Sequence, residues 1–139
     1  YQKLIDPILK GQASVVYGSR VLPGGSRTRP KTFDFKIRYL ANLFLTFLSN
    51  LLNKQKLTDA HTCYKVFDKD VFFKLDIKED DFAFCPEVTT KLSNIKQSIT
   101  EVPISYDGRE IKDGKKIRFS DAIKAVKVII KYKFFNNII

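Results

Sequence analysis

The sequence contains no methionine, no tryptophan, one histidine (His61) and two cysteines in 139 residues. Cys63 and Cys85 lie far apart in the chain, without a CxxC spacing and without a cluster of histidines. This pattern argues against a zinc site, because structural zinc needs four closely organised Cys or His ligands. So few cysteines are also typical of a reduced, cytosolic setting.

Long apolar runs are absent as well. The longest apolar stretch, from Tyr39 to Leu52, is interrupted by Asn42, Thr46 and Ser49 and is too short to span a bilayer. Low-complexity segments, internal repeats and long linkers are also missing, while 44% of the residues are hydrophobic. These features indicate a globular chain of one domain or less.

Acidic residues are scarce relative to basic ones, 15 against 25, which gives a net charge of +10. A surplus of this size implies an anionic partner: phosphate groups, a membrane surface or nucleic acid. Nucleic acid is the weakest of the three, because basic and aromatic residues do not interleave on a recognisable recognition element. We therefore expect no nucleic acid partner.

Helical and strand patterns alternate along the chain. Helical periodicity covers residues 1–10, 35–53, 68–75, a stretch from about 86 onward and 120–134, and β-branched or aromatic runs at 13–18, 64–67 and 98–106 predict strands. This order predicts an α/β fold, a mixed sheet with covering helices, in which Pro103 places its strand at an edge or a bulge. Because helical spacing begins at the first residue, which is not methionine, we expect residues 1–139 to be a single partial domain, the C-terminal part of a longer one.

Two polar segments lie beside predicted strands. Ser19 and Arg20 directly follow the strand at 13–18, and open α/β sheets bind ligands at strand ends, which makes Arg20 a candidate ligand for an anion. The stretch 57–67 places Asp59 beside Thr58. Spacing alone supports two interpretations of that pair equally, a functional site or an ordinary cap and turn.

The helix expected at 35–53 has a broad apolar arc and a narrower polar stripe. The arc consists of Leu40, Leu43, Phe44, Phe47, Leu48 and Leu51, and the stripe consists of Arg38, Asn42, Thr46, Ser49 and Asn53. Most amphipathic helices simply cover a core. The wide aromatic arc also suits a membrane interface, and the single cation of the stripe would then face an anion.

Cations are densest between residues 109 and 118. Arg109, Lys112, Lys115, Lys116 and Arg118 surround Gly114. Such a segment is able to wrap a diphosphate or to lie against an anionic membrane. The lysine stripe of the last helix, Lys124, Lys127 and Lys131, fits solvent or anionic lipid.

Several of these segments, taken in order, resemble a known family. They are Val15–Arg20, Arg38 with Asn42, Leu57–Asp59 followed by Thr62–Lys65, and Glu101–Tyr106 followed by Arg109 and Gly114–Ile117. The series resembles the second half of family 2 glycosyltransferases of the dolichyl-phosphate (polyprenyl-phosphate) mannose or glucose synthase type. The resemblance covers nearly the whole chain.

The resemblance implies the acceptor-side half of a GT-A fold, incomplete in this chain. The implied reaction moves a hexose, mannose or glucose, from a nucleotide diphosphate sugar to a polyprenyl phosphate with inversion. It also implies a Mg²⁺ or Mn²⁺ ion whose Asp-x-Asp ligands precede Tyr1, so we expect no metal site in this chain and no activity from it alone.

The resemblance also implies roles for individual residues. Arg20 and Arg38 would hold the acceptor phosphate with Asn42 and Ser19, and Arg109 and Lys115 would neutralise the leaving diphosphate. Asp59 would orient groups near the transferred sugar or act as a weak base, supported by Thr58, and Glu87 would contact the sugar. His61 is expected to be structural.

The implied setting is the cytosolic face of a membrane, to which the protein binds peripherally. The apolar arc of the helix at 35–53 would then lie near the polyprenyl chain. A homodimer is plausible because a partial sheet exposes its edges. The alternative from a different class is a non-catalytic basic module that binds anionic membranes or phosphate ligands.

Overall fold

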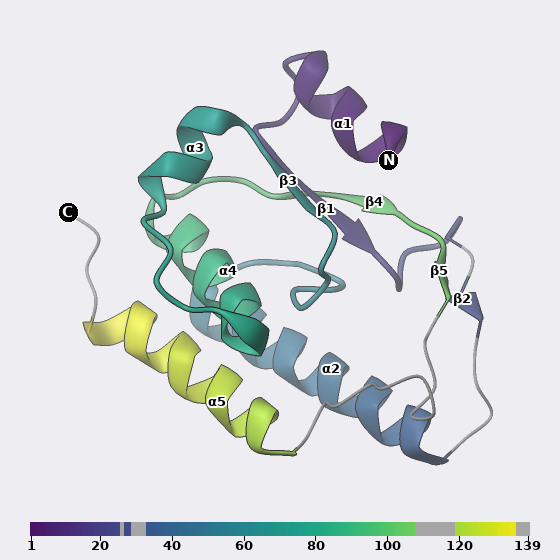
Figure 1. The fold of residues 1–139 in the computed structure, drawn as a ribbon, viewed down its shortest axis with the longest axis vertical. Helices are drawn as coiled ribbons and strands as arrows, with labels where there is room; N and C mark the ends of the chain where they lie inside the picture. The colour runs from purple at the N-terminus through teal and green to yellow at the C-terminus, as the bar shows by residue number, and fades with distance from the viewer. Residues whose placement is uncertain (26, 29–32, 108–118, 136–139) are drawn as a thin grey trace.

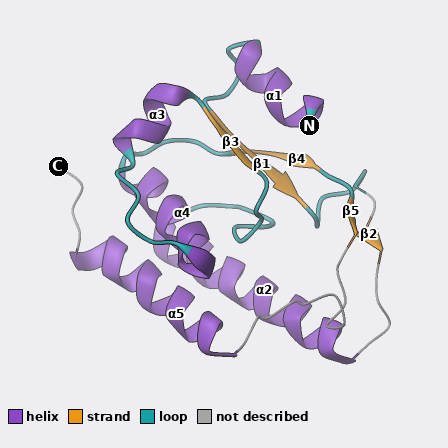
Figure 2. Cartoon of the chain, viewed as in Figure 1, coloured by secondary structure: helices purple, strands orange, loops and turns teal. Residues whose placement is uncertain are grey.

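A computed structural model describes residues 1–25, 27–28, 33–107 and 119–135 (Figures 1 and 2). Along the chain the elements are α1 (Gln2–Leu9), β1 (Val15–Ser19), β2 (Arg27–Thr28), α2 (Phe33–Asn53), β3 (Lys65–Phe67), α3 (Lys69–Lys74), the 3-10 turn η1 (Asp81–Ala83), α4 (Phe84–Asn94), β4 (Thr100–Pro103), β5 (Tyr106–Asp107), α5 (Phe119–Ile130) and the π-helical turn η3 (Lys131–Phe135). The predicted helices and strands are confirmed, with two differences. The short strand β2 was not predicted. The strand expected at 98–106 is divided into β4 and β5, which pair in different sheets.

The central strand is β1, in a three-stranded mixed sheet of order β3-β1-β4. It pairs antiparallel with β3 and parallel with β4, so that Tyr17 lies between Lys65 and Glu101. Strand β4 is an edge strand, as Pro103 predicts, since proline has no N–H to donate to a further strand. A second, two-stranded sheet pairs β2 with β5 in parallel. This α/β architecture is compatible with part of a GT-A fold.

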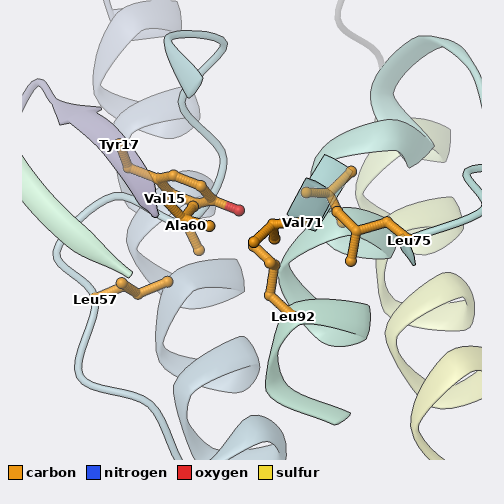
Figure 3. Packing of buried hydrophobic residues seen from close by; sticks show 8 residues of the cluster. Val15, Tyr17, Leu57, Ala60, Val71, Leu75 and Leu92 are labelled. Carbon is orange, nitrogen blue, oxygen red and sulfur yellow. The ribbon is translucent and has the colours of Figure 1, made fainter. Parts of the chain in front are cut away.

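Helices cover both faces of the main sheet (Figure 1). Helix α1 packs on β1 and β3, and its Leu4 is buried. On the other face, Val15 and Tyr17 of β1 pack with residues of α3 and α4 such as Val71 and Leu92 (Figure 3). The hydroxyl groups of Tyr17 and Thr89 lie 3.0 Å apart, which satisfies both polar atoms inside this core. All five residues of β1 are therefore buried, as expected of a strand covered on both faces.

Gly18 allows the chain segments around the end of β1 to approach one another. A Cβ at this position would lie 2.7 Å from a methyl carbon of Ile104 and 3.0 Å from Cβ of Tyr64. The amide of Gly18 also donates to the carbonyl of Tyr64 at 2.8 Å. Glycine therefore allows the residue before β3 and the residue after β4 to lie close to the end of β1.

Helix α2 leaves a stripe of large apolar residues exposed and buries three of its polar residues. Thr46, Ser49 and Asn53 are at most 4% exposed. The exposed apolar stripe consists of Phe33 (78% exposed), Ile37 (50%), Leu40 (62%), Phe44 (61%), Phe47 (63%) and Leu51 (64%). The polar stripe predicted from the sequence therefore faces the protein. Within the described ranges, no helix has the combination of length and hydropathy that crossing a bilayer requires.

Glu87 of α4 is 0% exposed. Together with Lys91 it binds the 76–79 loop, and we refer to these contacts as the loop clamp. Its carboxylate accepts hydrogen bonds from the backbone amides of Lys78 at 2.8 Å and Glu79 at 2.7 Å, and it pairs with Lys91 at 2.6 Å. Lys91 in turn donates to the carbonyl of Asp76 at 2.7 Å. These contacts fasten the 76–79 loop to α4, so the geometry favours a structural role for Glu87 over the expected sugar contact.

Candidate functional site

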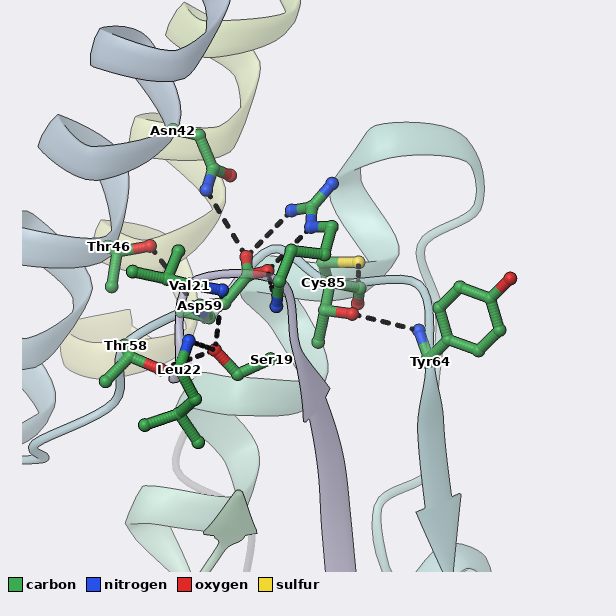
Figure 4. Close-up of polar contacts among 12 residues, drawn as sticks. Ser19, Val21, Leu22, Asn42, Thr46, Thr58, Asp59, Tyr64 and Cys85 are labelled. Carbon is green, nitrogen blue, oxygen red and sulfur yellow. Dashed lines mark hydrogen bonds and ion pairs between the residues drawn. The ribbon is translucent and has the colours of Figure 1, made fainter. Parts of the chain in front are cut away.

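The candidate site lies where β1 ends, between the loop at 57–64 and helix α2 (Figure 4). Ser19 is buried, and its hydroxyl accepts hydrogen bonds from the amides of Val21 at 3.1 Å and Leu22 at 3.2 Å. This local turn is typical of serine after a strand. The Ser19 hydroxyl also lies 2.6 Å from that of Thr58, which joins the strand end to the loop.

Arg20 and Asp59 form a two-bonded ion pair at the centre of the site. Nε of Arg20 donates to Oδ2 of Asp59 at 2.6 Å, and Nη2 donates to Oδ1 at 2.7 Å. The backbone amide of Arg20 adds a third contact, at 3.1 Å. The Asp59 side chain is 0% exposed and that of Arg20 is 16% exposed. Paired N–H donors of this kind fix the plane of the guanidinium as well as its position.

The two charges of this pair support each other's ionised form. Burial of Asp59 opposes its ionisation, but the hydrogen bonds and charge of Arg20 outweigh burial and hold the pKa of Asp59 below its ordinary value. Burial likewise disfavours the charged form of Arg20, and Asp59 outweighs it, so that the pKa of Arg20 is raised. Asp59 is therefore a charged orienting group, which is a poor proton acceptor.

Helix α2 supplies the other wall of the site. Asn42 donates to Oδ1 of Asp59 at 3.3 Å, and the hydroxyl of Thr46 accepts from the amide of Ala60 at 3.3 Å. Arg38 lies one helical turn before Asn42, on the same side of α2. The structure thus brings Ser19, Arg20, Asn42, Thr58 and Asp59 together, with Arg38 on the adjoining turn.

Glu101 of β4 belongs to the same cluster, although the sequence alone predicted no role for it. Its Oε2 accepts from the amide of Thr58 at 2.8 Å and from the hydroxyl of Thr58 at 3.0 Å. Its Oε1 accepts from the amide of Asp59 at 3.0 Å. The guanidinium carbon of Arg20 also lies 5.3 Å from the ring centre of Tyr106. Its position in the strand predicted at 98–106, as an acidic residue among mostly uncharged ones, could have pointed to a role for Glu101.

Glu101→Gln is expected to loosen the loop that holds Asp59. Glutamine keeps one acceptor oxygen but places an NH₂ group where a backbone amide now donates, so one buried donor loses its partner. We expect a loss of about 1–3 kcal/mol in the free energy of unfolding, measured by urea denaturation. Glu79→Gln, which removes a pair with the half-exposed Lys131, should cost under about 1 kcal/mol. Equal losses for the two variants would contradict this role.

His61 neighbours the cluster as a neutral side chain. Its burial, together with the charge of Lys65, lowers the pKa of His61 to about 4, against weaker opposition from Asp59. Among the described residues, its Nε2 atom is buried without a hydrogen-bond partner. These surroundings favour the structural role expected of His61.

The lowered pKa of His61 predicts that the free energy of unfolding depends on pH. The unfolded chain binds a proton near pH 6.5 and the folded one only near pH 4, so this stabilisation is complete above pH 6.5 and is lost as the pH falls towards 4. Between pH 7 and pH 5 we expect a loss of roughly 2 kcal/mol in the free energy of unfolding. His61→Gln should flatten the profile over this interval. Parallel profiles for the two proteins would show that His61 is not the group responsible.

Three predicted ligands remain: Arg109, Lys115 and Glu87. Arg109 and Lys115 fall outside the described residues, so their roles stay predictions. Glu87 has its own set of partners in the loop clamp. In the parts of the chain that the structure describes, no three His, Cys, Asp or Glu side chains gather as a metal site. Asp59 is a poor fit for a metal as well, because Arg20 already binds both of its carboxylate oxygens.

Comparison with known proteins gives two significant relatives. The chain is 28% identical over 112 residues to the low-salt glycan biosynthesis hexosyltransferase Agl6 of Haloferax volcanii, a match that covers 78% of this chain and 25% of the relative. It is 27% identical over 106 residues to the undecaprenyl-phosphate mannosyltransferase of Micrococcus luteus, covering 74% of this chain and 42% of the relative. The matched region is thus less than half of either relative.

No family model matches the chain. No solved structure matches it either. The two relatives nevertheless agree with the motif series read from the sequence. The chain is therefore similar to polyprenyl-phosphate sugar transferases of the family 2 type, and the resemblance found in its sequence is confirmed.

Proposed function

We propose that this chain is the acceptor-side part of an inverting glycosyltransferase. In this proposal the full-length protein moves a hexose, mannose or glucose, from a nucleotide diphosphate sugar to a polyprenyl phosphate at the cytosolic surface of a membrane. The observation that best supports it is the Arg20–Asp59 pair, a cation fixed at a strand end beside a helix with an exposed apolar stripe. The chain by itself is not expected to be active.

Arg20 suits the phosphate of the acceptor. A guanidinium has five N–H donors, and the pair with Asp59 uses two of them. Three donors remain on a side chain that is 16% exposed. Arg38, one turn from Asn42, would provide the second cation for the same phosphate. Asp59 fixes the plane of the Arg20 guanidinium. Less conformational entropy is therefore lost when this guanidinium binds two phosphate oxygens.

The chemistry proposed here needs little help from a base. A phosphate monoester is largely ionised near neutral pH, since its second pKa is about 6. Its oxygen would form a bond to the anomeric carbon while the bond from that carbon to the nucleotide diphosphate breaks. The task of this chain's residues is to hold the nucleophile in line and to offset repulsion between two anions. A charged Asp59 that orients Arg20 fits that task.

The divalent metal stays part of the proposal for the full-length protein. Its expected ligands precede this chain, and the donor set described here does not form a metal site. No step proposed for the residues of this chain depends on the ion. Arg109 and Lys115 are proposed to neutralise the leaving diphosphate.

The membrane surface is proposed as the partner of the α2 stripe. Helix α5 packs beside α2 and exposes Lys124 and Lys127 to solvent, and Lys131, the first residue of η3, is exposed as well. Apolar burial and attraction to anionic headgroups act together in peripheral binding. An acceptor whose chain lies in the bilayer would thereby meet Arg20 and Arg38 at the interface.

A transfer assay tests the proposed function. The full-length protein is incubated with a polyprenyl phosphate and with radiolabelled nucleotide diphosphate sugars of mannose and glucose in turn. We expect label in the lipid fraction from one of the two. If vesicles of anionic lipid bind the protein but neither sugar is transferred, the non-catalytic membrane module becomes the better explanation.

A further inference from the structure

The fold brings together two cysteines that lie far apart in the sequence. Cys63 belongs to the loop that leads into β3, and Cys85 lies in the first turn of α4. The thiol of Cys85 donates to the carbonyl of Thr62, the residue before Cys63, at 3.5 Å (Figure 4). This contact places the Cys85 thiol beside the backbone of Cys63. Both cysteines are unbridged in this structure.

The two thiols differ in their surroundings. Cys63 is exposed, whereas Cys85 is 8% exposed. Interaction with the Cys85 thiol, with further help from the charges of Lys65 and Arg20, lowers the pKa of Cys63 to about 6 in spite of partial burial. The same interaction and burial raise the pKa of Cys85. The exposed cysteine is therefore the more acidic of the two thiols.

Lys65 lies at the end of the same loop, where burial lowers the pKa of its ammonium group against the opposing charges of Cys85 and Asp59. The ammonium group donates to the carbonyls of Ala60, at 3.1 Å, and of Thr62, and it lies 4.2 Å from the ring centre of Tyr17. These contacts fix the Lys65 side chain against the 60–65 loop. An exposed thiol of lowered pKa with a second thiol nearby has the features of a redox-active cysteine.

We propose that Cys63 and Cys85 form a redox modification site, at which a peroxide oxidises the exposed cysteine and the buried one closes a reversible disulfide. The inference is independent of the proposed transferase activity. It is a modification of the loop that also holds Thr58 and Asp59, and it would tie that loop covalently to α4.

The chemistry balances with hydrogen peroxide as the oxidant. The Cys63 thiolate attacks one peroxide oxygen, the O–O bond breaks, and hydroxide leaves and takes up a proton as water, which gives a sulfenic acid. The Cys85 sulfur then attacks the Cys63 sulfur, the S–O bond breaks, and the departing hydroxide leaves as water with the Cys85 proton. Two thiols have lost two electrons in total, and the peroxide has been reduced to two waters.

Mass spectrometry tests the proposal on the full-length protein. After treatment with a small excess of hydrogen peroxide, non-reducing digestion is expected to give one linked peptide pair containing Cys63 and Cys85, with a mass about 2 Da below the sum of the two free peptides. Dithiothreitol should restore both free peptides. Persistence of two unlinked thiols at a peroxide dose that oxidises glutathione would overturn the proposal.

Two single variants assign the roles of the two cysteines. In Cys85→Ala, oxidation of Cys63 should give a sulfenic acid that dimedone traps. Without dimedone, this sulfenic acid should be oxidised further to the sulfinic acid. In Cys63→Ser, Cys85 should stay reduced, because it is buried. Dimedone labelling of Cys85 in Cys63→Ser at the wild-type rate would overturn the assignment. A cooperative thermal unfolding transition shows that each variant is folded. It thereby excludes loss of structure as the cause of a change in labelling.

Discussion

Replacing Asp59 with asparagine is expected to lower hexose transfer by the full-length protein by about two to three orders of magnitude. Asparagine keeps the size of the side chain but has one acceptor oxygen, so the Nε and Nη2 donors of Arg20 lose their shared carboxylate. The guanidinium then has neither its charge partner nor its fixed plane. Initial rates with saturating nucleotide sugar measure the loss.

The same substitution should reduce stability. Breaking a buried ion pair by removing one charge typically costs about 3–5 kcal/mol, and Asp59 is fully buried. Asp76→Asn is the matched control, because Asp76 is 71% exposed in its pair with Lys78. We expect that variant to keep its activity and most of its stability. An Asp59→Asn protein that is folded and transfers hexose at the wild-type rate would refute the role assigned to Asp59.

The double substitution of Phe44 and Phe47 by glutamine is expected to weaken binding to anionic vesicles by two orders of magnitude or more. These side chains are 61% and 63% exposed, so little core packing is lost. Burying one phenylalanine in an apolar environment contributes about 1.5–3 kcal/mol, and the two together account for the expected loss. Co-sedimentation with vesicles of mixed anionic and neutral lipid gives the binding constants.

The control for the α2 stripe is Phe73→Gln on α3. Phe73 is 71% exposed, and α3, which carries it, lies on the other side of the sheet strands from α2 in Figure 1. Its replacement should leave vesicle binding unchanged. Sedimentation velocity without lipid tests whether a second copy of the chain, instead of a membrane, covers the stripe. A dimer that dissociates in the Phe44/Phe47 variant, with vesicle binding intact, would assign the stripe to a second copy of the chain.

Local patterns were sufficient to predict most of the elements. The β-branched run before Gly18 and the proline of the edge strand act within a few residues, and each appears in the structure as expected. The helix expected at 68–75 also begins at a local signal, since Asp68 accepts from the amide of Asp70 at 2.9 Å as an N-cap. The division of β4 from β5 was not predictable, because it depends on pairing with the distant β2.

The side-chain partners in the site were harder to predict than its members. Arg20 and Asp59 were separate candidates in the sequence, and their pairing across 39 positions depends on how the 57–64 loop packs against the end of β1. Glu101 and Glu87 illustrate the same limit. Both are acids whose function depends on which backbone amides surround them, and sequence spacing contains no direct signal for that.

Helix α2 shows another limit of sequence patterns. Its periodicity predicts two faces, but periodicity does not say which face is buried. The structure buries Thr46, Ser49 and Asn53, and the NH₂ group of Asn53 donates to the hydroxyl of Thr90 at 3.2 Å. The apolar face is left exposed, and that inversion is the physical basis for proposing a membrane at this surface.

The central claim is that the Arg20–Asp59 cluster binds the acceptor phosphate. It is tested most directly by steady-state transfer kinetics of Arg20→Lys in the full-length protein, with each substrate varied in turn. Lysine keeps the charge but cannot form the two-bonded pair with Asp59. We predict a KM for polyprenyl phosphate raised at least about tenfold, with the KM for the nucleotide sugar nearly unchanged. A raised KM for the nucleotide sugar alone would contradict the claim.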